Sequence, residues 1–149
     1  MSIMLKDISS QNYQAIIELE LAEHQKQLVA PNVYSLAQAN YEKGMTPRAI
    51  YADDTPVGFI MYISLYFENT PNKYSIFRFM IDKHYQSKGI GKQALEQCIQ
   101  EISSIPDAEA IELSVPPSNT IASHFYQKFG FIKTGLIDED GEYVFELQL

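Results

Sequence analysis

The chain has 149 residues, of which 46% are hydrophobic, and its formal net charge at pH 7 is −8. This length and composition predict a single domain, residues 1–149, with one sizeable core. The negative charge disfavours a nucleic-acid-binding surface, because no basic stripe is present to replace phosphate counterions. The chain has neither a long apolar run nor a leader with a cleavage site, so we expect no membrane span and a cytoplasmic location.

The pattern of apolar residues predicts a mixed α/β chain. The expected elements, in chain order, are a strand at 3–6, helices at 12–21 and 35–43, strands at 47–52, 57–66 and 74–81, a helix at 92–102, a strand at 111–115, a helix at 119–129, and strands at 132–136 and 143–147. Most of these strands follow one another through hairpin connections instead of alternating with helices. The order therefore predicts an α/β sandwich and not a doubly wound parallel sheet.

A glycine-bearing turn, residues 86–91, joins the predicted strand 74–81 to the predicted helix 92–102. Its glycines allow positive φ and close approach to a ligand, while the free N–H groups and dipole of a helix start favour an anion. Lys88 and Lys92 add positive charge on either side. The turn matches neither the P-loop nor the dinucleotide fingerprint, and a plain turn before a surface helix is the alternative interpretation. After a strand, it predicts a phosphate-binding site.

The turn also carries a Gln-x-x-Gly-x-Gly run that resembles the acetyl-coenzyme A signature of the GNAT family of N-acetyltransferases. Phe79-Met80-Ile81-Asp82, just before it, resembles the family's cofactor strand. A second motif begins about 30 residues downstream. It resembles the family's Asn-x-x-Ala-x-x-x-Tyr-x-x-x-Gly-Phe segment and consists of Asn119, Ala122, Tyr126 and Phe129-Gly130-Phe131. Within the family, the run Tyr-Gln-x-Lys-Gly-Ile-Gly-Lys is most similar to small bacterial spermine and spermidine acetyltransferases.

The resemblance implies a mostly antiparallel central sheet flanked by helices, with strands 74–81 and 111–115 splayed apart around acetyl-coenzyme A. Backbone groups of Phe79, Met80 and Ile81 would then bind the pantetheine arm, with the Met80 amide polarising the thioester carbonyl. Asn119 would contact the cofactor from the other side of the cleft. The implied pyrophosphate cradle consists of Gln86, Ser87, Lys88, Gly89, Ile90, Gly91 and Lys92.

Tyr126 is the residue to which the resemblance assigns catalysis, as the acid that protonates the departing coenzyme A thiolate. It lies two turns after Asn119 on the predicted helix, so both side chains can face the same cleft. The alternative interpretation is a half-buried tyrosine that packs beside Phe125 and Phe129.

An amine acceptor must lose a proton before it attacks, because the pKa of an alkylammonium group is about 10.4. The sequence singles out no base. Glu20, Glu23 and Glu68 are the candidates, and each can also be read as a solvated carboxylate. His24 and His84 are expected at the surface. The three histidines and one cysteine show no ligand spacing, so no metal site is expected.

The sequence therefore predicts an acetyl-coenzyme A-dependent N-acetyltransferase that works by direct attack of a primary amine in a ternary complex. The resemblance and the negative charge favour a small cationic acceptor, a polyamine or diamine such as spermidine or spermine. The alternatives are a protein N-terminus, an amino acid or an aminoglycoside as acceptor, or a non-catalytic acyl-coenzyme A-binding module. A homodimer is expected, because many family members pair through their C-terminal strands.

Overall fold

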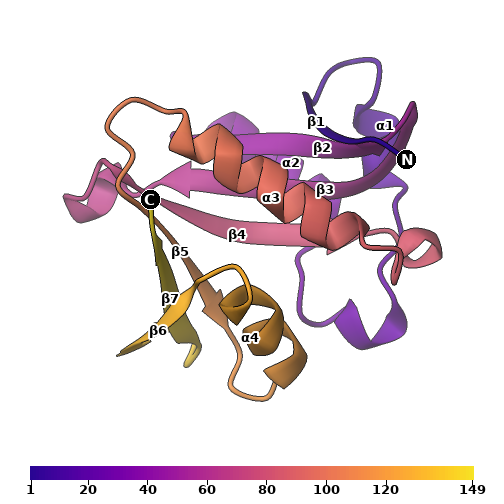
Figure 1. The fold of residues 1–149 in the computed structure, drawn as a ribbon. Helices are drawn as coiled ribbons and strands as arrows, with labels where there is room; N and C mark the ends of the chain where they lie inside the picture. The colour runs from indigo at the N-terminus through magenta and orange to yellow at the C-terminus, as the bar shows by residue number, and fades with distance from the viewer.

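The computed structural model describes residues 1–149 as one seven-stranded sheet covered by helices (Figure 1). The strands are β1 (Ile3–Asp7), β2 (Met45–Ala52), β3 (Thr55–Ser64), β4 (Lys73–Ile81), β5 (Ala110–Val115), β6 (Ile132–Ile137) and β7 (Tyr143–Gln148). The helices are α1 (Tyr13–Ile17), α2 (Asn32–Tyr41), α3 (Ile90–Ser103) and α4 (Thr120–Gln127), with short 3-10 helices at Glu23–Gln25, Tyr66–Glu68 and Lys83–Tyr85. The strand order is β1-β2-β3-β4-β5-β7-β6, and only β4 and β5 pair in parallel. The predicted mixed, mostly antiparallel sheet is confirmed.

Helices cover both faces of the sheet, and each face has its own apolar core. On one face α3 buries an apolar stripe that includes Leu95 and Cys98. On the other face Ile16 of α1 packs with Phe59 and Met61 of β3, and α2 lies beside them. Figure 1 shows α3 in front of β2, β3 and β4 and α2 behind them. None of the helices combines the length and the apolar character that crossing a bilayer requires.

The first helix is shorter than predicted, because α1 ends at Ile17 and not at Leu21. The backbone of Glu20 is bound by the segment after β4 instead. Its N–H donates to the Asp82 carboxylate at 2.8 Å, and its carbonyl accepts from the Lys83 N–H at 2.8 Å. These groups cannot also continue the helical ladder, so a contact distant in sequence ends the helix.

The second helix begins three residues earlier than predicted, at Asn32, and ends at Tyr41. The Pro31 carbonyl accepts from the N–H groups of Tyr34 and Ser35, at 3.0 and 3.2 Å, and a proline suits a helix start because its missing N–H is not needed there. The Asn32 side chain donates to the Ile16 carbonyl at 2.9 Å and ties α2 to α1. The other predicted elements are confirmed, with bounds that shift by at most two residues.

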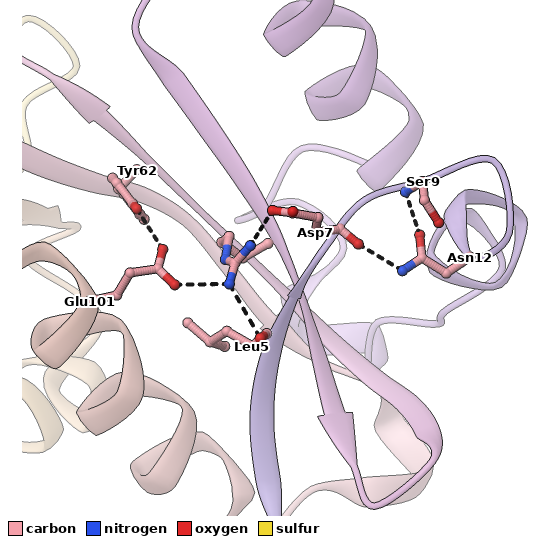
Figure 2. Close-up of polar contacts among 7 residues, drawn as sticks. Leu5, Asp7, Ser9, Asn12, Tyr62 and Glu101 are labelled. Carbon is pink, nitrogen blue, oxygen red and sulfur yellow. Dashed lines mark hydrogen bonds and ion pairs between the residues drawn. The ribbon is translucent and has the colours of Figure 1, made fainter.

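A polar network fixes α3 on the sheet (Figure 2). The Arg48 guanidinium of β2 pairs with Glu101 of α3 at 3.0 Å and with Asp7 of β1, and it donates to the Leu5 carbonyl at 3.2 Å. The Tyr62 hydroxyl donates to the second oxygen of Glu101 at 2.5 Å. Burial and the neighbouring Glu101 raise the pKa of Tyr62. Three strands and a helix thus share one ion-paired cluster.

We expect Glu101→Gln to lower the free energy of unfolding by about 1–3 kcal/mol, because a largely buried Arg48 loses one charged partner. The measurement is the midpoint of urea unfolding followed by circular dichroism. Glu96→Gln, on the exposed face of the same helix, is the matched control and should leave the midpoint unchanged. Equal midpoints for the two variants would show that the network does not stabilise the fold.

Candidate active site

The site begins where β4 and β5 part. Their parallel pairing joins only Lys73–Ser75 to Ala110–Glu112. Beyond it β4 stays with β3 as far as Ile81, while β5 stays with β7 as far as Val115, and Figure 1 shows the two strands diverging. The edge of β4 from residue 76 to residue 81 therefore has no strand partner. An extended ligand can bind such an edge as an added strand does.

The direction of the β4 backbone groups follows from one hydrogen bond. The Asp82 N–H donates to the Val57 carbonyl at 2.8 Å, so this is a hydrogen-bonded pair of the β3–β4 ladder. Because such pairs alternate with non-bonded ones, the Met80 backbone also points to β3, whereas Phe79 and Ile81 point to the open edge. The geometry favours Phe79 and Ile81 as partners of an extended ligand. It turns the Met80 amide away from the thioester role expected above.

The turn after β4 presents free N–H groups. Ser87 and Gly89 have positive φ, 63° and 77°, and Gly89 immediately precedes α3 with no side-chain cap on the helix start. The N–H groups of the first turn of α3 and its dipole can therefore face an anion. Lys88 and Lys92 are exposed on either side of the turn. The predicted phosphate cradle thus has the backbone conformation that an anion site needs.

Gly91, in the first turn of α3, lies beside the open edge of β4. A Cβ at this position would lie 3.8 Å from Ile81 and 3.9 Å from Phe79, in ordinary contact. The neighbouring Ile90 side chain is buried in the core, so only its backbone is available to a ligand. The helix start and the β4 edge form one continuous surface, which suits a pyrophosphate followed by an amide-containing arm.

The Gln86 side chain points inward. Its Nε2 donates to the Ile81 carbonyl at 2.8 Å and to the Gln25 side chain at 2.9 Å. Gln86 therefore holds the turn in shape, with its side chain bound to the protein itself.

Asp82 ties the same turn to the segment after α1. Its buried carboxylate accepts from the N–H groups of Glu20 and His84, at 2.8 and 2.9 Å, and contacts His84 Nδ1 at 2.8 Å. Burial raises the pKa of Asp82, but these hydrogen bonds outweigh it and leave the pKa below its ordinary value. His84 lies at the surface, as expected.

The second motif lies on α4, which Figure 1 shows beside β5 at the diverging strands. Asn119 caps α4, and its side-chain oxygen accepts from the Ala122 N–H at 3.1 Å. The Tyr126 ring packs edge-on against Phe125 and Phe131, with ring centres 5.3 and 5.9 Å apart. Its hydroxyl makes no hydrogen bond within the chain, and burial raises its pKa to about 12. Tyr126 combines the packing role with a free donor.

A cleft of about 610 Å³ opens on the α2 side of the sheet where the strands part. Both parted strands contribute to it, through Ser75 and Phe77 of β4 and through Glu112 and Ser114 of β5. The other lining residues come from the loops and strands around them and are Glu42, Lys43, Met45, Ile63, Leu65, Tyr66, Phe67, Glu68, Asp138 and Val144. Four carboxylates face a single lysine there, so the cleft is acidic.

The structure separates the three acidic residues proposed as bases from the sequence. Glu68 lines the acidic cleft. Glu20 pairs with Lys83 at 3.4 Å, beside the phosphate turn, and Glu23 pairs with Lys26 at 2.6 Å. The hydrogen bond from Lys26 lowers the pKa of Glu23.

Sequence reasoning missed Glu112 and Asp138, which line the same cleft as Glu68. The signal for Glu112 is its isolation, because it is the only charged residue in the strand Ala-Ile-Glu-Leu-Ser-Val. A lone carboxylate in a strand with no other charged residue is unusual. Burial raises the pKa of Glu112, and the nearby charges of Glu68 and Glu146 raise it further. Asp138 gives no comparable signal, since it reads as an ordinary turn residue.

Comparisons with known proteins agree on one family. Residues 13–131 match the acetyltransferase (GNAT) family. The chain is 34% identical to a probable spermine N(1)-acetyltransferase of Bacillus subtilis subsp. natto (strain BEST195) and 33% identical to a spermine/spermidine N(1)-acetyltransferase of Bacillus subtilis (strain 168). Both alignments cover the whole of both chains.

Solved structures share the fold at lower identity. The aminoglycoside acetyltransferase AAC(6')-Ib in complex with coenzyme A superposes with a TM-score of 0.81 at 17% identity, over 99% of this chain and 95% of that chain. The PaiA N-acetyltransferase of Thermoplasma acidophilum, also in complex with coenzyme A, gives a TM-score of 0.71 at 18% identity over the whole of both chains. The family match and the full-length relatives lead to one conclusion: the chain belongs to the GNAT family of acetyltransferases, enzymes that use acetyl-coenzyme A as the acetyl donor.

Proposed function

We propose that the acetyl acceptor is a polyamine or diamine such as spermidine or spermine. The observation that carries this proposal is the acidic cleft where β4 and β5 part. The names of the two Bacillus relatives support the same acceptor class.

The chemistry of the cleft suits a long cation. Primary alkylamines are protonated at neutral pH, and carboxylates attract them more strongly in a cleft than on an open surface. The exposed rings of Tyr66 and Phe67 offer their faces to an ammonium group. Ile63 and Leu65 offer apolar surface to the methylene chain between charges. Separated charges joined by apolar linkers are what distinguish a polyamine from a simple amine.

The donor side of the proposal uses mainly backbone groups. Phe79 and Ile81 would bind the pantetheine amides along the open edge, and the turn from Ser87 through the start of α3 would bind the pyrophosphate. Lys88 and Lys92 would add charge to that contact. Asn119, across the diverging strands, remains a proposed cofactor contact in addition to its capping role.

Tyr126 is the proposed general acid. Its pKa of about 12 keeps the hydroxyl protonated at neutral pH, so a donor is always present. The pKa of a free thiol is only about 8.5, so this proton transfer needs local assistance, which the charge developing on a departing sulfur in the same buried surroundings supplies by raising the pKa of that sulfur. The hydroxyl has no partner within the chain to compete for that proton.

The proposal includes two further expectations from the sequence, a cytoplasmic location and a homodimer. β6 lies at the edge of the sheet, and Ile132, Leu136 and Ile137 on it are 71%, 66% and 63% exposed. An exposed apolar edge strand favours pairing with another strand. A second copy of β6 would cover these side chains on both partners at once.

We expect Gly89→Ala to weaken acetyl-coenzyme A binding about tenfold, measured by isothermal titration calorimetry. Alanine at positive φ costs about 1–2 kcal/mol, and relief of that strain would rotate the N–H groups that face the phosphates. Gly141→Ala is the matched control, because Gly141 has nearly the same φ, 78°, and equally open surroundings but lies in the β6–β7 turn. Equal affinities of the two variants would remove the turn from the donor site.

Acetyl transfer should be selective for spermidine and spermine in a panel that also contains short diamines, amino acids, peptide N-termini and an aminoglycoside. Release of free coenzyme A thiol is the readout. The KM for spermidine should rise with ionic strength, because salt screens the carboxylates of the cleft. If the enzyme acetylates another class of amine in the panel faster than spermidine and spermine, that class replaces the polyamines as the proposed acceptor. Coenzyme A binding without any turnover would favour the non-catalytic module.

In the same assay, Tyr126→Phe should lower kcat at least about tenfold, which corresponds to about 1.4 kcal/mol of barrier. Its thermal unfolding should not change, because the lost hydroxyl makes no hydrogen bond within the chain. Tyr74→Phe, a second half-buried tyrosine packed against the same core, is the control and should keep full activity. Full activity of Tyr126→Phe would leave Tyr126 with the packing role alone.

Light scattering should give a mass twice that of the 17.0 kDa chain for the wild-type protein. Leu136→Asp should shift the mass to that of one chain, because it places a charge in the proposed β6 interface. Leu28→Asp is the control, because Leu28 is 52% exposed but far from β6 in the sequence, and this variant should keep the mass of the dimer. A wild-type monomer would contradict the dimer.

A further inference from the structure

We propose that Glu112 is the catalytic residue that takes the proton from the acceptor ammonium group, a role that rests on the proposed function. Glu112 pairs with Ser75 at the last point where β4 and β5 are joined. Its neighbours Ile111 and Leu113 point into the α3 core, so the Glu112 side chain points to the opposite face and lines the acidic cleft.

Glu112 is also uncommitted. It makes no hydrogen bond or ion pair within the chain, although a lysine is close enough to influence it. That lysine, Lys73, pairs with Glu146 of β7 at 3.3 Å instead. A half-buried carboxylate with no partner is free to bind an incoming cation.

The other carboxylates of the cleft are less suited to accept a proton. Asp138 accepts from the N–H groups of Asp140 and Glu142, both at 2.9 Å, and such bonds stabilise its charged form and lower its pKa against the effect of burial. Glu68 and Glu42 are exposed. We assign these three to attraction of the cation, and Glu112 to the proton.

The surroundings of Glu112 bring its basicity closer to that of the amine. Burial, Glu68 and Glu146 raise its pKa, while Lys73 acts in the opposite direction. The remaining charged groups of the cleft are Glu42, Lys43 and Asp138. A raised pKa makes a carboxylate a better base as long as it stays ionised at the working pH. Activity is therefore lost as the pH falls through the pKa of Glu112.

The proton transfers balance as follows. Ionised Glu112 takes one proton from the ammonium nitrogen and later releases it to water. The neutral nitrogen forms the bond to the acetyl carbon as the carbon–sulfur bond breaks. The sulfur receives the Tyr126 proton, and Tyr126 regains one from the same nitrogen. One proton is released for each amide formed.

The first test compares Glu112→Gln with the wild type over a range of pH. We expect kcat/KM for spermidine to fall at least about a hundredfold at pH 7, and the rate of the variant to keep rising with pH, since only amine that is already neutral can react. The loss should shrink with a fluorinated diamine of low pKa. Glu112→Asp should recover part of the activity. Glu109→Gln, exposed just before β5, is the control.

A uniform loss at every pH and with both amines would overturn the base role, because it would show cation binding only. Unchanged kinetics would overturn it as well. The affinity for acetyl-coenzyme A, measured by calorimetry, should be the same in all variants.

The second test does not depend on turnover. The Glu112 carboxyl, identified by its absence from the Glu112→Gln spectrum, is titrated by carbon NMR with and without spermidine. Spermidine should lower its pKa, because a bound ammonium favours the charged carboxylate. If the pKa of Glu112 is the same with and without spermidine, Glu112 does not face the acceptor. If spermidine moves the titration but no amine is acetylated, the polyamine contact stands, and the catalytic role and the proposed function fail.

Discussion

The short parallel contact between β4 and β5 is the constraint on which the rest of the structure depends. Three residue pairs join the four-stranded half of the sheet to the three-stranded half, and beyond them each strand keeps only its outer neighbour. A longer ladder would close the β4 edge, and no ladder would leave two separate sheets. The apolar core under α3 holds the halves together, because it contains side chains from both, such as Ile76 and Phe145.

This arrangement separates two regions of opposite charge that the net charge of −8 averages away. The basic region is the turn at Lys88 and Lys92, where backbone N–H groups face outward. The acidic region is the cleft on the α2 side, where four carboxylates meet one lysine. The open β4 edge connects them. In the proposed complex, an anionic donor and a cationic acceptor would approach the same strand from different ends without competing for the same groups.

The sequence predicted the local elements that carry the two motifs. A glycine turn before a helix and a motif within one helix depend on residues close in the chain, so their spacing is readable. The end of α1 cannot be read from spacing in this way, because it is set by Asp82, which is 62 residues from Glu20. Glu112 stands out as the lone charge of its strand, but the cleft that gives it a role also contains Glu68 and Asp138, which come from other parts of the chain. Contacts between segments distant in the sequence decide both the end of α1 and the surroundings of Glu112, and patterns within a single sequence do not contain those contacts.

The unpaired edge of β4 also has a consequence for the life of the protein in the cell. An edge with free backbone groups can recruit strands from other chains, which makes it a starting point for aggregation. In the proposed donor complex, acetyl-coenzyme A would cover that edge only while it is bound, and any ligand that binds the folded state alone increases the folded fraction by mass action. Under that proposal, the supply of acetyl-coenzyme A would change the folded fraction of the enzyme as well as its rate.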